Sequence, residues 1–261
     1  VLQRPLAEDT PIEIIQQLHS PPPPSPPPPP PPPLPLTRDL FVLKVIHSGS
    51  VDWVVEGGGT GDDIGRDIAM ITHSDIYISG YFDSETATFG NTTLTRLGWW
   101  DMLLLKMDLE TREVTWGIVG GGRGPDYAHA VVPRTPLPEC IWPVPEGCGS
   151  LYVTGSFWDE ATFGKYVLNA HSTSRRVDTD LFVLEVDVLS GEVLWAVSSG
   201  GSLTDRGYAA ATVRRAGGSG NDARDGAVFI TGPFKSWDGK FGRSTETPLA
   251  TNGGSDLFVM K

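Results

Sequence analysis

From residue 39 onward, short apolar runs alternate with Gly- and Asp-rich turns. Runs such as DYAHAVV, SLYVTGSF, DLFVLEVD and EVLWAVSS have the alternating or continuous apolar character of β-strands. Gly-Gly pairs and aspartates separate them, as turn residues do. The pattern predicts units of four antiparallel strands and an all-β fold.

Three anchors recur in a fixed order along this region. Strands that open with Asp are DLFVLKV, DMLLLKMD, DLFVLEVD and DLFVMK, starting at Asp39, Asp101, Asp180 and Asp256. A Trp strand that runs into glycines follows each of the first three, 14, 15 and 15 residues after the Asp. The third anchor is an apolar strand ending in a small residue and Gly (DIYISG, SLYVTG, AVFITG), with a Phe-Gly coda 9, 8 and 9 residues later.

The repeat periods are 62, 79 and 76 residues, and the extra length falls in two inserts, PRTPLPECIWPVPEGCGS and RRAGGSGNDARDGA. Both inserts lie between corresponding strands, which places them in loops on one face of the array. Four antiparallel strands in a repeat of about 60 residues are the signature of a β-propeller blade. The units are approximately 39–100, 101–179, 180–255 and a partial 256–261.

These anchors resemble the SBBP repeat of bacterial-type β-propellers. The resemblance covers residues 39–261 and implies a propeller of which about three blades are present. Because a closed propeller needs at least four blades, we expect the others to lie outside this chain or another subunit to close the ring. We favour a fragment of a longer protein, since an open array exposes apolar strand edges.

A different composition precedes the repeats. In the arm, residues 1–20, Thr10, Pro11 and Glu13 fit a helix N-terminus, and an apolar stripe follows, which predicts a short helix. Residues 21–36 are nearly all proline, and proline fixes φ and removes the N–H donor, which predicts a semi-rigid polyproline II rod. A solvated linker, an SH3-type ligand and a segment packed within an assembly are the three interpretations of this rod.

The proline run resembles hydroxyproline-rich glycoproteins of plant and green-algal cell walls, including pherophorin-like and flagellar-hair proteins. The resemblance implies hydroxylation and O-glycosylation along the run. The positions concerned are Pro21, Pro22, Pro23, Pro24, Ser25, Pro26, Pro27, Pro28, Pro29, Pro30, Pro31, Pro32 and Pro33.

The net charge and the cysteine content limit the classes of partner and the cellular compartment that we expect for the protein. The net charge of −12 argues against a nucleic-acid partner or an anionic membrane surface. No apolar stretch reaches the roughly 18 residues of a membrane span, so we expect no membrane insertion. Cys140 and Cys148 are either two free thiols or a small disulfide that closes the first insert, and the disulfide, which we favour, implies an oxidising compartment. Two thiolates alone make a poor zinc site.

No catalytic constellation is present. Asp62 and Asp63 suggest a calcium loop, but only one acid recurs, at Asp63, Asp126 and Asp205, and calcium takes six to eight oxygens. We therefore interpret these aspartates, and those that open strands, as turn caps. The five histidines (His19, His47, His73, His129 and His171) share no repeat position, and no triad, HExxH or P-loop sequence occurs. The sequence predicts no enzyme, no cofactor and no metal.

Tryptophans and one sequon complete the candidates. Trp53, Trp116 and Trp195 occur once per repeat and are predicted to be core residues. Trp99 and Trp100 break the repeat; they are candidates for stacking on a glycan, although we favour packing between blades. Asn91 heads the only N-x-S/T sequon and is a candidate N-glycosylation site in a surface turn.

The favoured function is that of a non-enzymatic structural protein of an extracellular matrix, cell wall or cell or flagellar surface filament. Its propeller would act as an interaction disc held by the proline rod. Its partners would be other chains of the assembly, which include copies of itself as one option, and it would carry covalently attached glycans. The alternatives are a carbohydrate-binding propeller, an intracellular scaffold with a proline-rich ligand and, as a distant third class, an enzyme, since fold alone does not decide function.

Overall fold

A computed structural model describes residues 37–71, 73–134, 149–171, 178–212, 227–241, 250–251 and 253–260. All of them belong to one unit of the chain, Leu36–Lys261. Their regular structure consists of β-strands, and no helix occurs in these ranges, which confirms the predicted all-β class. The predicted N-terminal helix, the proline rod, Cys140 and Cys148 lie outside the described residues.

Four kinds of strand recur, and we call them A, B, C and D strands after their order within a sheet. The A strands are β3 (Asp63–Met70), β9 (Tyr127–Pro133) and β15 (Ala209–Thr212). The B strands are β4 (Asp75–Phe82), β10 (Ser150–Trp158) and β16 (Val228–Phe234). The C strands are β1 (Leu40–Val45), β7 (Asp101–Asp108), β13 (Thr179–Asp187) and β17 (Asp256–Met260). The D strands are β2 (Val51–Gly57), β8 (Val114–Gly122) and β14 (Val193–Ser199).

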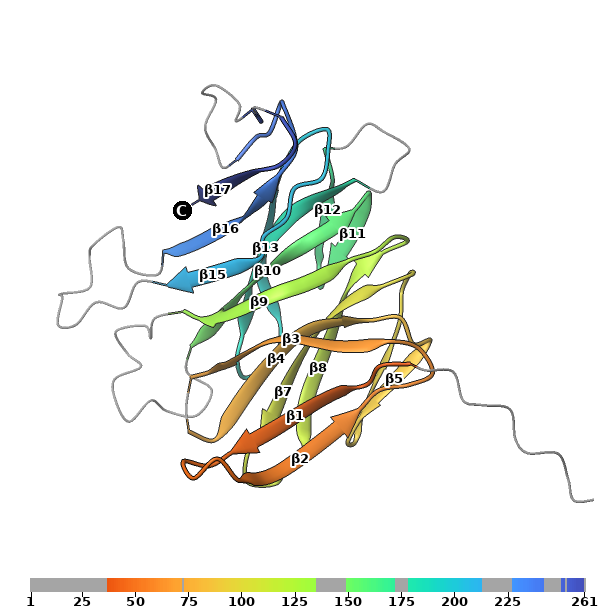
Figure 1. Cartoon of the computed structure of the whole chain (residues 1–261). Helices are drawn as coiled ribbons and strands as arrows, with labels where there is room; N and C mark the ends of the chain where they lie inside the picture. The colour runs from red at the N-terminus through yellow and green to blue at the C-terminus, as the bar shows by residue number, and fades with distance from the viewer. Residues whose placement is uncertain are drawn as a thin grey trace, which may run out of the picture. The chain divides into compact units, whose positions relative to one another are not determined.

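All strand pairs are antiparallel, and two sheets contain the complete A-B-C-D order (Figure 1). These are β3-β4-β7-β8 and β9-β10-β13-β14. The second contains the segments DYAHAVV, SLYVTGSF, DLFVLEVD and EVLWAVSS, which the sequence analysis predicts to be strands. The sheet β15-β16-β17 has A, B and C strands, and β1-β2 has C and D strands. The A strands β3, β9 and β15 are neighbours although they belong to different sheets.

In the first two units the Phe-Gly coda is a β-hairpin, which the sequence analysis did not predict. Its strands are β5 (Thr86–Phe89) with β6 (Thr92–Thr95), and β11 (Glu160–Phe163) with β12 (Tyr166–Asn169). Strand β11 also pairs with β8, the D strand of the preceding sheet, so the coda ties consecutive units together. Two-residue turns that begin at Gly90 (φ 58°) and Gly164 (φ 60°) close the hairpins, as expected where glycine holds the first central position.

The glycine that ends each B-strand anchor is required by close packing. A Cβ atom on Gly80, Gly155 or Gly232 would lie 2.0, 1.8 or 2.0 Å from a carbonyl oxygen on or next to the neighbouring A strand. The sheet register also shifts next to Gly80 and Gly155, which marks a β-bulge. The small residue and Gly that end each B-strand anchor therefore mark a close approach between the A strand and the B strand in every unit.

The three apolar cores lie between consecutive sheets and depend on the C strands. The second and fourth residues of each Asp-initiated C-strand segment face the following sheet, and the third and fifth face the preceding one. The first core joins Leu40 and Val42 to Leu103 and Leu105, the second joins Met102 and Leu104 to Phe182 and Leu184, and the third joins Leu181 and Val183 to Phe258 and Met260.

The recurrent tryptophans sit at these interfaces with different degrees of burial. Trp53 is a buried core residue, whereas Trp116 and Trp195 are half-buried at the margins of the second and third cores. The Trp116 indole N–H donates to the Val188 carbonyl at 3.3 Å and so bridges two sheets. The prediction that these tryptophans are core residues is confirmed for Trp53, whereas Trp116 and Trp195 lie at the margins of their cores.

Candidate functional site

The recurrent A-strand aspartates form a structural clamp. Asp63, Asp126 and Asp205 are fully buried, and each accepts a hydrogen bond at Oδ2 from the backbone N–H four residues earlier, at 2.7, 2.7 and 2.9 Å. The backbone N–H of each aspartate also donates to the backbone carbonyl of the residue just before a C-strand aspartate. These carbonyls belong to Arg38, Trp100 and Thr179. These carboxylates thus join the end of a D strand, the start of an A strand and the start of a C strand.

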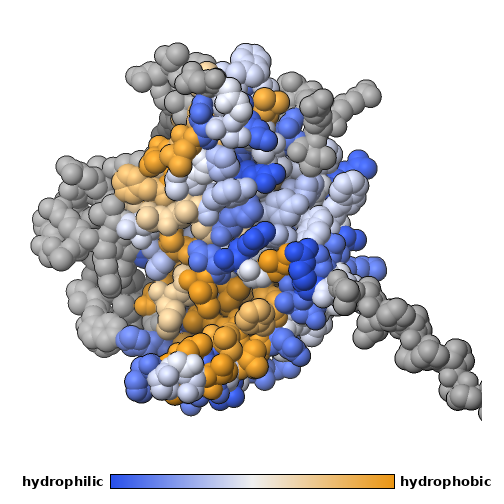
Figure 2. Space-filling view, in the orientation of Figure 1, coloured by the Kyte–Doolittle hydropathy of each residue, from blue (hydrophilic) through white to orange (hydrophobic). Residues whose placement is uncertain are grey.

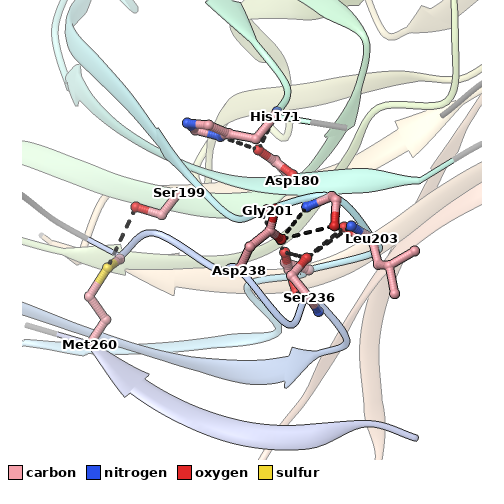
Figure 3. Close-up of polar contacts among 10 residues, drawn as sticks. His171, Asp180, Ser199, Gly201, Leu203, Ser236, Asp238 and Met260 are labelled. Carbon is pink, nitrogen blue, oxygen red and sulfur yellow. Dashed lines mark hydrogen bonds and ion pairs between the residues drawn. The ribbon is translucent and has the colours of Figure 1, made fainter. Parts of the chain in front are cut away.

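In the third unit the clamp includes a serine. The Ser236 hydroxyl lies 2.6 Å from Asp205 Oδ2 and accepts from the Leu203 N–H at 2.9 Å, and Figure 3 shows Ser236 beside Leu203 in this network. Ser84 occupies the same place beside Asp63 in the first unit, at 2.8 Å. The clamp oxygens are therefore largely occupied by protein donors.

Each A-strand aspartate has a C-strand aspartate beside it. A Cβ atom on Gly121 would lie 2.2 Å from Asp101 Oδ1 and 2.7 Å from Asp126 Oδ2, so both carboxylates converge on this glycine. Burial, with the nearby charge of Asp101 as a lesser cause, raises the pKa of Asp126 to about 8. Burial also raises the pKa of Asp101, whose Oδ1 has no hydrogen-bond partner in the described structure. Asp126 is therefore largely protonated at neutral pH, with the Asp101 side chain beside it.

The Asp180 carboxylate has a histidine partner instead. His171 Nδ1 lies 2.6 Å from Asp180 Oδ2, and the His171 backbone N–H donates to the same oxygen at 2.8 Å (Figure 3). Burial raises the pKa of Asp180 to about 6, while the His171 hydrogen bonds oppose that rise. The imidazole shares no repeat position with the other histidines, so the repeat pattern did not predict this pair.

A cavity of about 700 Å³ opens near the first residues of the A strands. This is the end of the strands opposite the A–B connections that carry the two inserts. The first and third positions after the clamp aspartate line it in the second and third units, and the third position alone lines it in the first unit. Tyr127 and Arg206 occupy the first position, and Arg66, His129 and Tyr208 occupy the third. Arg38, Tyr81 and Trp100 complete the lining.

Aromatic rings give the cavity a packed wall. The Tyr81 ring lies edge-on to Tyr127 at 4.6 Å between centroids and to Trp100 at 5.3 Å. His129 stacks on Tyr127 at 5.9 Å and meets Tyr208 edge-on at 4.9 Å. These separations fall within the range that interacting aromatic rings prefer, so the rings form a continuous aromatic wall.

Positive charge dominates the electrostatics of this wall. The Arg66 guanidinium lies 4.9 Å above the Tyr81 ring and donates to its hydroxyl, and Arg206 donates to the Tyr208 hydroxyl at 3.2 Å. Burial, followed by the charges of Arg66 and Arg206, lowers the pKa of His129 to about 4. The imidazole is therefore neutral near pH 7, and the charge at the wall comes from arginine.

The candidates at Trp99, Trp100 and Asn91 have different surroundings. Trp100 is half-buried in the cavity wall, between strands of two sheets, whereas Trp99 is 67% exposed, so the favoured inter-blade packing is wrong for Trp99. Asn91 is exposed in the turn between β5 and β6. Its side-chain amide donates to Glu113.

The two ends of the array expose apolar C-strand faces. Phe41 and Leu43 are 67% and 44% exposed on β1, and Leu257 and Val259 are 73% and 69% exposed on β17. Figure 2 shows hydrophobic residues gathered over β1 and β2. The repeat-equivalent residues in β7 and β13 are buried to 2% exposure or less. The end positions thus have the composition of sheet interfaces, but within the described ranges no further sheet covers them.

The described residues supply no cluster of three or more His, Cys, Asp or Glu side chains with metal-binding geometry. Within the same ranges, no helix has the length and apolarity of a membrane span. A scan against protein-family models finds no matching family, and a search of curated proteins finds no matching relative.

Proposed function

We propose that the chain is a non-enzymatic structural and assembly glycoprotein of an extracellular matrix, cell wall or surface filament. Its four-strand sheets serve as propeller-type blades that form an interaction disc, and the proline rod tethers that disc. The observation that carries the proposal is the pair of exposed apolar faces on β1 and β17.

The repeat supplies an internal comparison for these faces. At every junction inside the array, the second and fourth residues of one C-strand segment pack against the third and fifth residues of the next. Phe41 and Leu43 are third and fifth residues, and Leu257 and Val259 are second and fourth residues, against which no sheet packs within the described ranges. The β17 face is therefore equivalent to the natural partner of the β1 face.

This complementarity favours head-to-tail association between two copies of the chain. Each contact would reproduce an interface that the chain already forms three times internally, with apolar burial as its driving force. Such an interface is heterologous, so it generates a closed ring or an extending filament. Ring closure by a second subunit and filament growth both suit a structural role.

The carboxylates of the repeats support a non-catalytic interpretation. The clamp aspartates bind backbone N–H groups and are fully buried, so they contribute to structure in each unit. The cavity at the A strands is lined by arginine and aromatic side chains without a carboxylate, so the paired acids of a hydrolase are not found on that wall.

Sedimentation velocity of the full chain tests the assembly. Phe41→Glu and Val259→Glu each remove one end face, whereas Leu189→Glu places the same charge at an exposed leucine in the β13–β14 turn and serves as the matched control. We expect the wild type and Leu189→Glu to self-associate and both end variants to be monomeric. A mixture of the two end variants should form dimers only, since one intact face remains on each.

Three results would contradict this proposal. A wild type that stays monomeric at high concentration removes the driving observation. Single variants that still dimerise indicate a symmetric interface elsewhere, and a mixture that stays monomeric shows that the two faces do not recognise each other.

A further inference from the structure

The A-strand cavity gathers positive charge in an acidic chain. Arg38, Arg66 and Arg206 contribute to its lining, and no Asp or Glu does. Arg38 is ion-paired with Asp62. Arg66 and Arg206 form no ion pair with a carboxylate in the described ranges, and Arg206 Nε is buried without a hydrogen-bond partner there. In a protein with a net charge of −12, this places two uncompensated guanidinium groups in one cavity.

The orientation of these guanidinium groups is fixed by tyrosines. Arg66 packs over the Tyr81 ring, and Arg206 donates to the Tyr208 hydroxyl. In these contacts each guanidinium donates one hydrogen bond, and a guanidinium has five N–H donors. The remaining donors are available to the planar, bidentate recognition of an oxyanion for which arginine is suited.

The aromatic part of the cavity wall indicates that the ligand has an apolar surface in addition to an anionic group. Trp100, Tyr127 and Tyr208 place ring surfaces beside the arginines, and about 700 Å³ lies within the usual size range of small-molecule sites. An inorganic anion would leave these rings and most of the volume unused. A sugar ring has an apolar C–H face that packs on aromatic rings and hydroxyl groups that bond to tyrosine.

We propose that this cavity is a binding site for an acidic saccharide, in which Arg66 and Arg206 hold a carboxylate or sulfate group and the Trp100, Tyr127 and Tyr208 rings pack against the sugar. The site lies at the A strands and goes beyond the assembly function; its Arg66 also lines a hollow next to Phe41 and Leu43 of the β1 face, whereas Leu257 and Val259 of the β17 face line neither hollow. It makes the chain a protein that contacts an anionic polysaccharide of its surroundings through a defined pocket.

Isothermal titration calorimetry of the full chain with a short oligogalacturonate tests the site, with a neutral galacto-oligosaccharide of equal length as the matched ligand. We expect binding of the acidic sugar and at least a tenfold weaker response to the neutral one. Arg206→Gln and, separately, Arg66→Gln should each weaken oligogalacturonate binding about tenfold or more, as loss of a charge-assisted hydrogen bond predicts. Trp100→Leu should weaken binding of the same ligand without changing the charge of the site.

Two controls separate this site from general effects. Arg123→Gln removes the same charge from an exposed position outside the cavity lining and should leave the affinity unchanged. Val259→Glu, which removes the β17 assembly face and lies outside the cavity lining, should also bind normally, so failure of the assembly proposal and failure of the saccharide proposal are distinguishable. A thermal midpoint for each variant confirms that the compared proteins are folded, and Arg66→Gln replaces Arg206→Gln if the latter does not fold.

Four outcomes would overturn the proposal. These are no binding of oligogalacturonate or of a sulfated galactan fragment, equal binding of the neutral sugar, unchanged affinity in both arginine variants, or inorganic sulfate binding as tightly as the oligosaccharides. The last would mean an anion site without a saccharide.

Discussion

The Asp101–Asp126 pair predicts that stability falls as pH rises through neutrality. Burial raises the pKa of Asp126 to about 8, whereas an aspartate in an unfolded chain titrates near 4. Between these values the folded protein keeps a proton that the unfolded chain has lost. A folded pKa raised above the unfolded one therefore gives stability that is fully present at low pH and is lost as pH rises towards 8.

The size of the effect follows from this linkage. One proton of difference changes the free energy of unfolding by about 1.4 kcal/mol per pH unit. Because Asp126 itself begins to ionise near its folded pKa, the loss between pH 6 and pH 8 amounts to about 2 kcal/mol. Asp126→Asn removes this proton and keeps one carbonyl acceptor for the backbone N–H groups of Gly122 and Trp158 that Asp126 binds.

Urea denaturation at pH 6, 7 and 8, followed by tryptophan fluorescence, measures the difference. We expect Asp126→Asn to be less stable than wild type at pH 6, through its lost acceptor, and to gain about 2 kcal/mol relative to wild type by pH 8. Asp108→Asn is the control, because hydrogen bonds from Thr111 lower the pKa of Asp108, which is then ionised in both states above pH 6. Its profile should run parallel to wild type. An Asp126→Asn profile that also runs parallel would refute the raised pKa of Asp126 as the cause of the pH dependence.

Three further predictions concern the glycine anchors, the first insert and the proline run. Gly155→Ala should lower the free energy of unfolding by about 3 kcal/mol in urea denaturation, because its Cβ would lie 1.8 Å from the Tyr127 carbonyl oxygen. Gly65→Ala is the control, because the next unit has Ala128 at the same position, and it should lower the free energy of unfolding far less. Equal losses in the two variants would contradict close A–B strand packing as the reason for Gly155. Alkylation of the native chain without reductant should leave Cys140 and Cys148 unmodified in peptide mass spectrometry if they form the expected disulfide, and two labelled thiols would exclude it. Mass spectrometry of the native Val1–Arg38 peptide should show hydroxylation and pentose or hexose on the Pro21–Pro33 run, and an unmodified mass would remove the wall-glycoprotein resemblance and favour an intracellular ligand or plain spacer.

Residues that repeat were predictable from the sequence, because each has the same structural task in every unit. The spacing from Asp101 to Trp116 predicted the C and D strands, and the glycine of SLYVTG is explained by its crossing with the A strand. The coda hairpins were missed although Gly90 and Gly164 open two-residue turns between short apolar stretches. A run of four residues with few apolar positions is a weak strand signal, and β11 gains its stability from pairing with β8 in the preceding sheet.

The cavity was not predictable from the repeat, because its residues are the ones that do not repeat. The third position after the clamp aspartate is arginine in one unit, histidine in the next and tyrosine in the third. Read along the chain, these positions look like ordinary variation, and their common direction is evident only once the A strands β3, β9 and β15 lie side by side.

The difference between positions that repeat and positions that do not also indicates where a binding site can lie in such an array. Positions that every unit shares, such as the clamp aspartates and the Gly anchors, are occupied by backbone hydrogen bonds and strand crossings, so substitution there affects folding before it affects binding. Positions that differ between units are free of that constraint, and those on the A strands face one cavity. The concentration of Arg66 and Arg206 there, in a chain with an excess of acids, has no structural counterpart in the other units. Selection for a ligand accounts for such an arrangement more directly than selection for the fold.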